Sequence, residues 1–168
     1  EDADFILSNY GDWRNIITFI GDDEDNNLHV DQADKLATLV DTTYKQFNVE
    51  KIYLDAYKQE SNSSGQRYPE VNIAINNRIN RGALIMNYSG HGGELGLAHE
   101  RILGLTDINS WNNTNNLMVF VTATCEFSRF DDPERTAAGE YVLLSKKGGA
   151  IALYTTTRLA FASSNYNL

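Results

Sequence analysis

The sequence contains little cysteine and little histidine: one cysteine, Cys125, and three histidines among 168 residues. A lone cysteine excludes a disulfide within the chain, so cysteine usage does not indicate the redox compartment. No apolar run approaches the roughly 18 residues that a membrane-spanning helix requires, and the first residues do not form a secretory signal. The chain also lacks an initiator methionine and ends in a loop-like run at 163–168, so we expect it to be part of a longer protein.

Positive charge is scarce as well. The chain has 14 Lys and Arg against 23 Asp and Glu, a formal net charge of −9. Nucleic-acid binding is therefore not expected, because no basic stripe is available to neutralise phosphates. The 42% hydrophobic and 22% charged residues are ordinary for a globular protein, and the length suits one domain with a core of its own.

Short apolar runs alternate with amphipathic stretches along most of the chain. The runs at 15–20, 51–55, 83–87, 117–121 and 150–154 predict buried strands, and the stretches at 33–47, 69–82, 107–111 and 133–147 predict helices. The stretches at 58–67 and 92–100 are polar and are predicted to be loops. This alternation predicts a three-layer α/β/α sandwich with a mostly parallel sheet. We interpret the acidic residues 1–12 as a connector from an upstream region and residues 13–168 as the domain.

Cys125 and His91 each follow one of these predicted strands. The ends of neighbouring parallel strands meet at one edge of a sheet, where ligands and chemistry collect. A thiol and an imidazole at that edge would form a nucleophile with its acid/base partner. The alternatives are that Cys125 is a small buried hydrophobe and that His91 only marks a glycine-rich turn.

A cysteine peptidase also requires donors for an oxyanion. The backbone N–H groups of Gly92 and Cys125 are our candidates, because glycine has no side chain to block the approach of a substrate. The alternative role for the glycines around His91 is purely conformational.

The acidic run Gly21–Asn27 follows the first predicted strand. It suits a solvated turn, a cation site, or a carboxylate that orients the active-site histidine. Zinc is not expected, because the spacing of His91 and His99 fits neither a helical i,i+4 pair nor a tight-turn pair. We expect no cofactor and no metal; calcium bound by this acidic loop is the alternative.

The motif Asn-Tyr-Ser-Gly-His-Gly after one strand, followed by an apolar strand that ends in Ala-Thr-Cys, resembles the gingipain-type cysteine peptidases. Nearly the whole chain, from Trp13 to Phe161, resembles that family. The stretches 87–94, 120–131 and 147–153 are similar to the type IX secretion sortases of Bacteroidetes. The resemblance implies a caspase-like fold and makes residues 13–168 a peptidase catalytic domain that lacks its C-terminal part.

The resemblance also implies roles for individual residues. Cys125 is the nucleophile, His91 the general acid/base, and Gly92 and Cys125 the oxyanion donors. An acid after the first strand orients the histidine; this corresponds to Asp23, with Asp22 and Glu24 as near equals. His29 occupies the place where Arg-specific gingipains have an acid at the base of the S1 pocket, so a preference for arginine is not expected. Residues 156–161, with Thr156 and Phe161, would form a wall of that pocket.

The implied activity is removal of the C-terminal secretion signal from cargo proteins at the outer membrane, on the extracellular side of the cell surface. The expected partners are proteins that carry this signal, other components of the secretion system, and a surface glycolipid whose amine resolves the acyl-enzyme. A general secreted endopeptidase and an inactive binding module with the same fold are the alternatives.

Overall fold

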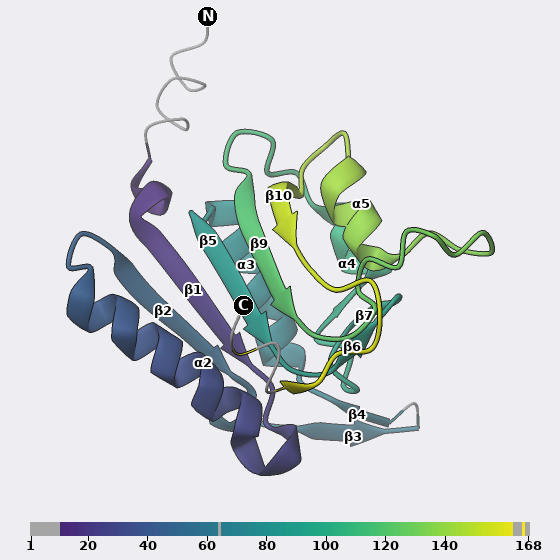
Figure 1. Ribbon diagram of the computed structural model, residues 1–168, viewed down its shortest axis with the longest axis horizontal. Helices are drawn as coiled ribbons and strands as arrows, with labels where there is room; N and C mark the ends of the chain where they lie inside the picture. Colours follow the sequence, from purple (N-terminus) through teal and green to yellow (C-terminus); the bar gives the residue numbers. More distant parts are fainter. Residues whose placement is uncertain (1–10, 64, 163–165, 167–168) are drawn as a thin grey trace, which may run out of the picture.

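A five-stranded parallel sheet forms the centre of the protein (Figure 1). The computed structural model describes residues 11–63, 65–162 and 166. The strands lie in the order β10-β9-β5-β1-β2, and all four pairings are parallel. Their bounds are β1 Ile16–Gly21, β2 Asn48–Tyr53, β5 Ile85–Ser89, β9 Met118–Ala123 and β10 Ala150–Tyr154. The predicted strand order along the chain and the mostly parallel sheet are confirmed.

Helices cover both faces of this sheet. Helix α2 (Glu24–Thr43) lies on one face, and α3 (Pro69–Arg81), α4 (Leu105–Ser110) and α5 (Ala138–Leu144) share the core of the other. Strand β1 shows how the two cores divide: Ile17 and Phe19 pack with Ala37 of α2, whereas Ile20 packs with the core that includes Ile75 of α3. Successive side chains of a strand point to opposite faces, so one strand serves both cores.

Four segments differ from the sequence-based prediction. Helix α2 runs from Glu24 to Thr43, so it begins within the acidic run 21–27 and ends before residue 47. The stretch 58–67 includes the hairpin β3 (Glu60–Asn62) and β4 (Gly65–Arg67) instead of being only a loop. The polar stretch after His91 forms a small antiparallel sheet of β6 (Gly92–Gly93), β7 (Gly96–Leu97) and β8 (Leu103–Gly104). Helix α5 begins at Ala138, not at Pro133.

The remaining short elements lie near the ends of strands. A 3-10 helix spans Asp12–Asn15 and another spans Leu54–Ala56. Residues 1–10 of the predicted connector, and most of the terminal run 163–168, lie outside the described residues. In the part of the chain that the structure describes, no helix combines the length and apolar character needed to span a bilayer.

Candidate active site

The register of β5 and β9 places His91 and Cys125 at corresponding positions. Ser89 is paired with Ala123 at the carboxyl ends of these neighbouring strands, and the Gly90 N–H donates to the Ala123 carbonyl at 3.3 Å. His91 follows Ser89 by two residues, and Cys125 follows Ala123 by two. The structure therefore delivers both residues to one edge of the sheet, where α/β folds collect their chemistry.

The backbone of His91 is held from two sides. Its N–H donates to Asp22 Oδ2 at 2.9 Å, and its carbonyl accepts the Tyr88 hydroxyl at 2.6 Å. Asp22 and Tyr88 are both fully buried. Gly90 permits this packing, because a Cβ there would lie 2.3 Å from Asp22 Cβ and 2.4 Å from the Tyr88 oxygen. Buried polar groups with satisfied hydrogen bonds rigidify their surroundings, so the His91 backbone is fixed relative to the sheet.

The His91 ring contacts carboxylates of α2. Its Nε2 lies 2.9 Å from Asp25 Oδ2 and 3.7 Å from Glu24 Oε2, and the ring stacks on His99 with centroids 4.9 Å apart. The hydrogen bond to His91 lowers the pKa of Asp25 below its usual value. The carboxylate is therefore ionised at neutral pH and accepts the hydrogen bond. No hydrogen bond joins the His91 ring to Cys125 within the ranges 11–63 and 65–162.

The other predicted acids have different partners. Asp23, the predicted orienting residue, accepts the Tyr68 hydroxyl at 2.5 Å, and Asp22 contacts the His91 backbone and not its ring. Glu24 contacts His99 Nδ1 at 2.8 Å. Of the four acids of the loop, only Asp25 and Glu24 thus contact the His91 ring, and Glu24 lies closer to His99. Calcium binding by the loop stays a prediction. Asp25, the acid nearest the His91 ring, belongs to the acidic run predicted to orient the histidine, but it is not one of the three acids that the family resemblance singled out.

The backbone of α2 explains how Asp25 reaches His91. Asp25, Asn26 and Asn27 have φ values of 55°, 57° and 61°, in the left-handed region. Asp and Asn tolerate this conformation better than most residues. The run Asp25-Asn26-Asn27 is the only sequence feature that hints at this left-handed backbone. It is a weak one, because Asp and Asn are also common in ordinary turns.

His29, the predicted residue of the S1 pocket, lies beside His91. The two rings meet edge to face with centroids 5.2 Å apart, and Asp25 Oδ2 is 3.5 Å from His29 Nε2. The His29 residue is only 6% exposed. Burial lowers the pKa of His29 below its usual value, which favours the neutral imidazole.

Cys125 lies in the loop after β9, next to the segment that follows β10. Its Sγ lies 3.4 Å from the Ala160 carbonyl and 3.5 Å from the Ala160 nitrogen, and its side chain is half-buried. The next residue, Glu126, has a φ of 49°. Strained backbone of this kind clusters at functional sites, and here it turns the chain sharply just after the thiol.

The segment after β10 runs along the Cys125 loop, and its role as a pocket wall stays a prediction. Thr156 Oγ1 donates to the Thr124 carbonyl, the Ser128 N–H donates to the Thr156 carbonyl at 3.1 Å, and the Glu126 N–H donates to the Arg158 carbonyl at 3.2 Å. Phe161 is 82% exposed. Thr156 thus contacts the nucleophile loop directly, whereas Phe161 extends into solvent.

Gly92 lies against the residue that precedes Cys125. A Cβ at Gly92 would be 2.6 Å from Thr124 Oγ1 and 3.0 Å from the Gly96 carbonyl. The Gly92 backbone therefore packs directly on the Cys125 loop. The structure brings together the two segments that carry the predicted oxyanion donors, and their catalytic role stays a prediction.

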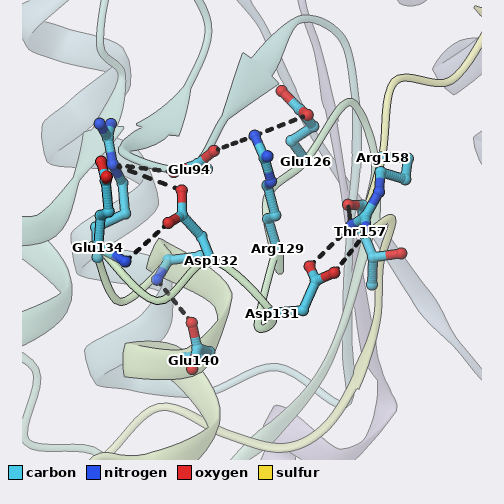
Figure 2. Close-up of polar contacts among 11 residues, drawn as sticks. Glu94, Glu126, Arg129, Asp131, Asp132, Glu134, Glu140, Thr157 and Arg158 are labelled. Carbon is cyan, nitrogen blue, oxygen red and sulfur yellow. Dashed lines mark hydrogen bonds and ion pairs between the residues drawn. The ribbon is translucent and has the colours of Figure 1, made fainter.

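Ion pairs connect the loop after Cys125 to the segment after His91 (Figure 2). Glu94, two residues beyond Gly92, accepts a hydrogen bond from Arg129 at 3.0 Å and forms an ion pair with Arg135 at 3.2 Å. Arg129 also lies 3.5 Å from Glu126. The Glu94 side chain is only 11% exposed, so solvent screens these pairs less than fully exposed ones. A cavity of about 710 Å³ lies over this region, lined by residues that include Gly92, Glu94, His99, Glu126 and Arg135.

A comparison with known protein families identifies the chain. The family model described as "Peptidase family C25" matches residues 3–168. The chain belongs to peptidase family C25. No curated protein matches it significantly.

Solved structures share the fold of this C25 member. Gingipain R, an Arg-specific cysteine proteinase, superposes with a TM-score of 0.71 at 19% identity, over 92% of this chain and 34% of that one. The complex of Porphyromonas gingivalis RgpB pro- and mature domains gives 0.74 at 19% identity, over 95% and 36%. A third structure, named as a protease, gives 0.67 at 15% identity, over 92% and 31%. The chain thus has the gingipain-type, caspase-like fold and spans about a third of the length of these chains.

Proposed function

We propose that this C25 member is a cysteine endopeptidase in which Cys125 attacks the scissile carbonyl and His91 transfers the proton. The observation that carries the proposal is the register of β5 and β9, which delivers both residues to one edge of the sheet. The family membership supports the same chemistry.

The contact with Asp25 determines which nitrogen of His91 is basic. An ionised carboxylate only accepts hydrogen bonds, so His91 Nε2 carries the proton that binds Asp25. In the neutral ring Nδ1 is then the free base. We assign acid/base transfer to Nδ1 and orientation of the ring to Asp25; Asp23 instead accepts a hydrogen bond from Tyr68.

The reaction then has two steps. Cys125 Sγ forms a bond to the carbonyl carbon while the proton of the thiol passes to His91, and the N–H groups of Gly92 and Cys125 bind the oxyanion. The C–N bond breaks as His91 protonates the leaving amine, which leaves a thioester. Water or a second amine, deprotonated by His91, attacks this thioester and releases the thiol.

The proposed substrate is a cargo protein with a C-terminal secretion signal of the type IX system. The likeness of the stretches around His91 and Cys125 to the type IX sortases supports this class. His29 supports it as well, because a buried imidazole stands where Arg-specific relatives are expected to have an acid. We place the enzyme at the outer surface of the outer membrane, where an amine of a surface glycolipid could resolve the thioester.

The chemistry is tested by the alkylation rate of Cys125 with iodoacetamide between pH 5 and pH 9. In the wild type we expect fast modification near neutral pH, since a thiolate beside an imidazole is reactive. His91→Ala should slow it by at least about tenfold at pH 7, and His99→Ala should change it little. Slow alkylation that is unchanged in His91→Ala would contradict the dyad and favour a binding module.

The substrate class is tested separately with two fusions, one carrying a C-terminal secretion signal and one carrying a scrambled sequence of equal composition. We expect cleavage of the first fusion alone, and none by Cys125→Ala. Equal cleavage of both fusions would favour a general endopeptidase instead.

A further inference from the structure

All three histidines of the chain lie together, although they come from separate parts of the sequence. The His91 ring is 5.2 Å from the His29 ring and 4.9 Å from the His99 ring. Asp25 and Glu24 complete the cluster on the side of α2. The proposed reaction uses His91 and Asp25 but gives no chemical role to His29.

Three donor atoms in this cluster have the separations of metal ligands. Asp25 Oδ2 lies 2.9 Å from His91 Nε2 and 3.5 Å from His29 Nε2, and all three atoms lie within 4.8 Å of one another. Zinc binds imidazole nitrogen and carboxylate oxygen at about 2.0–2.1 Å, so two ligands of one tetrahedral ion lie about 3.3 Å apart. The two distances from Asp25 Oδ2 lie on either side of that value.

The environment of His29 points to a missing ligand. Its Nε2 is buried and has no hydrogen-bond partner in the described part of the chain. The residue is 6% exposed, and the atom faces Asp25 and His91. A buried polar atom without a partner is destabilising. A metal ion at the centre of the cluster would use the lone pair of this nitrogen.

We propose that His29 Nε2, His91 Nε2 and Asp25 Oδ2 bind a zinc ion, with the fourth position open to water. Imidazole nitrogens suit zinc, whereas magnesium and calcium prefer sites made of oxygen. The proposed site differs from the calcium loop considered for this segment, because two of its three ligands are histidines. It departs from the sequence-based expectation of no zinc, which rested on the spacing of His91 and His99, because here the second histidine is His29.

Zinc at this site would block the peptidase, an inference that rests on the proposed function. His91 can bind the ion through Nε2 only after that atom has lost its proton. The ring proton then resides on Nδ1, so the nitrogen assigned as the base becomes a donor. Zinc binding would thus remove the base while leaving Cys125 in place.

Binding is tested by titration calorimetry with zinc chloride, on the wild type and on variants whose fold is checked by circular dichroism. We expect binding by the wild type and by Cys125→Ala with equal affinity. His29→Ala should weaken binding by more than about 100-fold, beyond the 10–100-fold typical of groups that only support a ligand. Asp25→Asn should also weaken it; its side chain is 55% exposed, so this variant keeps the test decisive if His29→Ala does not fold. The matched control is Asp31→Asn, an exposed acid of the same helix, which should bind zinc like the wild type.

Two results would overturn the site: no zinc binding by the wild type, or equal affinity in the wild type and Asp25→Asn. Loss of binding in Cys125→Ala would overturn it too, because the thiol would then be a ligand. The effect on reactivity is measured apart, as the alkylation rate of Cys125 with and without zinc. If the dyad is inactive, alkylation is slow throughout while calorimetry still detects the ion, so the two proposals fail in distinguishable ways.

Discussion

At the scale of the residue, Gly92 shows how closely the two halves of the site pack. Its backbone touches Thr124, whose side-chain oxygen is buried. Any side chain at position 92 would have to displace either this threonine or the backbone of Gly96. The neighbouring Gly93 has no atom within 4 Å of the position where its Cβ would lie. The two glycines therefore form a matched pair for experiment.

We expect Gly92→Ala to lower kcat/KM by about 10–100-fold, because the shift of Thr124 or Gly96 would move the proposed oxyanion donors. Loss of one such donor costs about 100–1,000-fold in kcat, and overpacking costs about 1–3 kcal/mol of stability. Gly93→Ala should stay close to the wild type in both quantities. The measurements are peptide cleavage kinetics and chemical denaturation. Equal behaviour of the two variants would show that the contact with Thr124 does not matter.

The sequence predicted which residues reach the edge of the sheet but not how their side chains pair. His91 and Cys125 follow apolar runs, and the strand order confirms that their strands are neighbours. The contact of His91 with Asp25 depends on three consecutive left-handed residues, and no periodic pattern encodes those. The partner of the His91 ring could therefore be predicted only as one of several acids.

At the scale of the element, long apolar patterns were predictable and short strands were not. Strands β6, β7 and β8 have two residues each, too few to show alternation. Helix α5 begins late because the preceding residues bond elsewhere: Arg135 pairs with Glu94, and the Glu134 N–H donates to Asp132. The N–H group of Ala138, the first residue of the helix, donates a hydrogen bond to the Glu94 carbonyl. A proline is a common first residue of a helix, but Pro133 lies in a turn instead.

Helix α3 is joined to the sheet by a paired arginine. Arg78 donates to Glu50 of β2 through Nε at 2.5 Å and Nη2 at 2.7 Å, and Thr18 of β1 donates to the same carboxylate at 2.9 Å. The side chain of Arg78 is 14% exposed. A two-pronged pair of this kind depends on the planar guanidinium, which lysine lacks.

We therefore expect Arg78→Lys to lower the free energy of unfolding by about 1.5–3 kcal/mol, the scale of a hydrogen bond to a charged group. Arg81→Lys, an exposed position on the same helix, should change it by less than about 0.5 kcal/mol. Urea denaturation measures both. In a double-mutant cycle with Glu50→Gln, a coupling energy near zero would show that the pair does not anchor the helix.

At the scale of the whole molecule, acidic groups outnumber basic ones, and two carboxylates among the described residues are almost fully buried. Asp22 is fully buried and satisfied by the His91 and Glu24 N–H groups. Glu100 is 2% exposed; one of its oxygens accepts from Gln59 at 3.3 Å, and the other has no partner among the described residues. Burial raises the pKa of Glu100 above its usual value. The folded state therefore holds this ionised carboxylate at a cost that the unfolded chain does not bear.

Because of this cost, the contribution of Glu100 to the free energy of unfolding falls as pH rises. The folded pKa of Glu100 is raised, so its favourable contribution is full below the unfolded pKa of about 4.3 and is lost as pH rises through the folded pKa. Glu100→Gln removes this titration.

We expect the variant to be more stable than the wild type at pH 7 by about 1 kcal/mol, the scale of a buried unsatisfied group. The difference should shrink as pH falls toward 4. Denaturation of both proteins at several pH values measures it, with the exposed Glu134→Gln as control. A difference that does not change with pH would show that packing, and not the buried charge, sets the stability at this position.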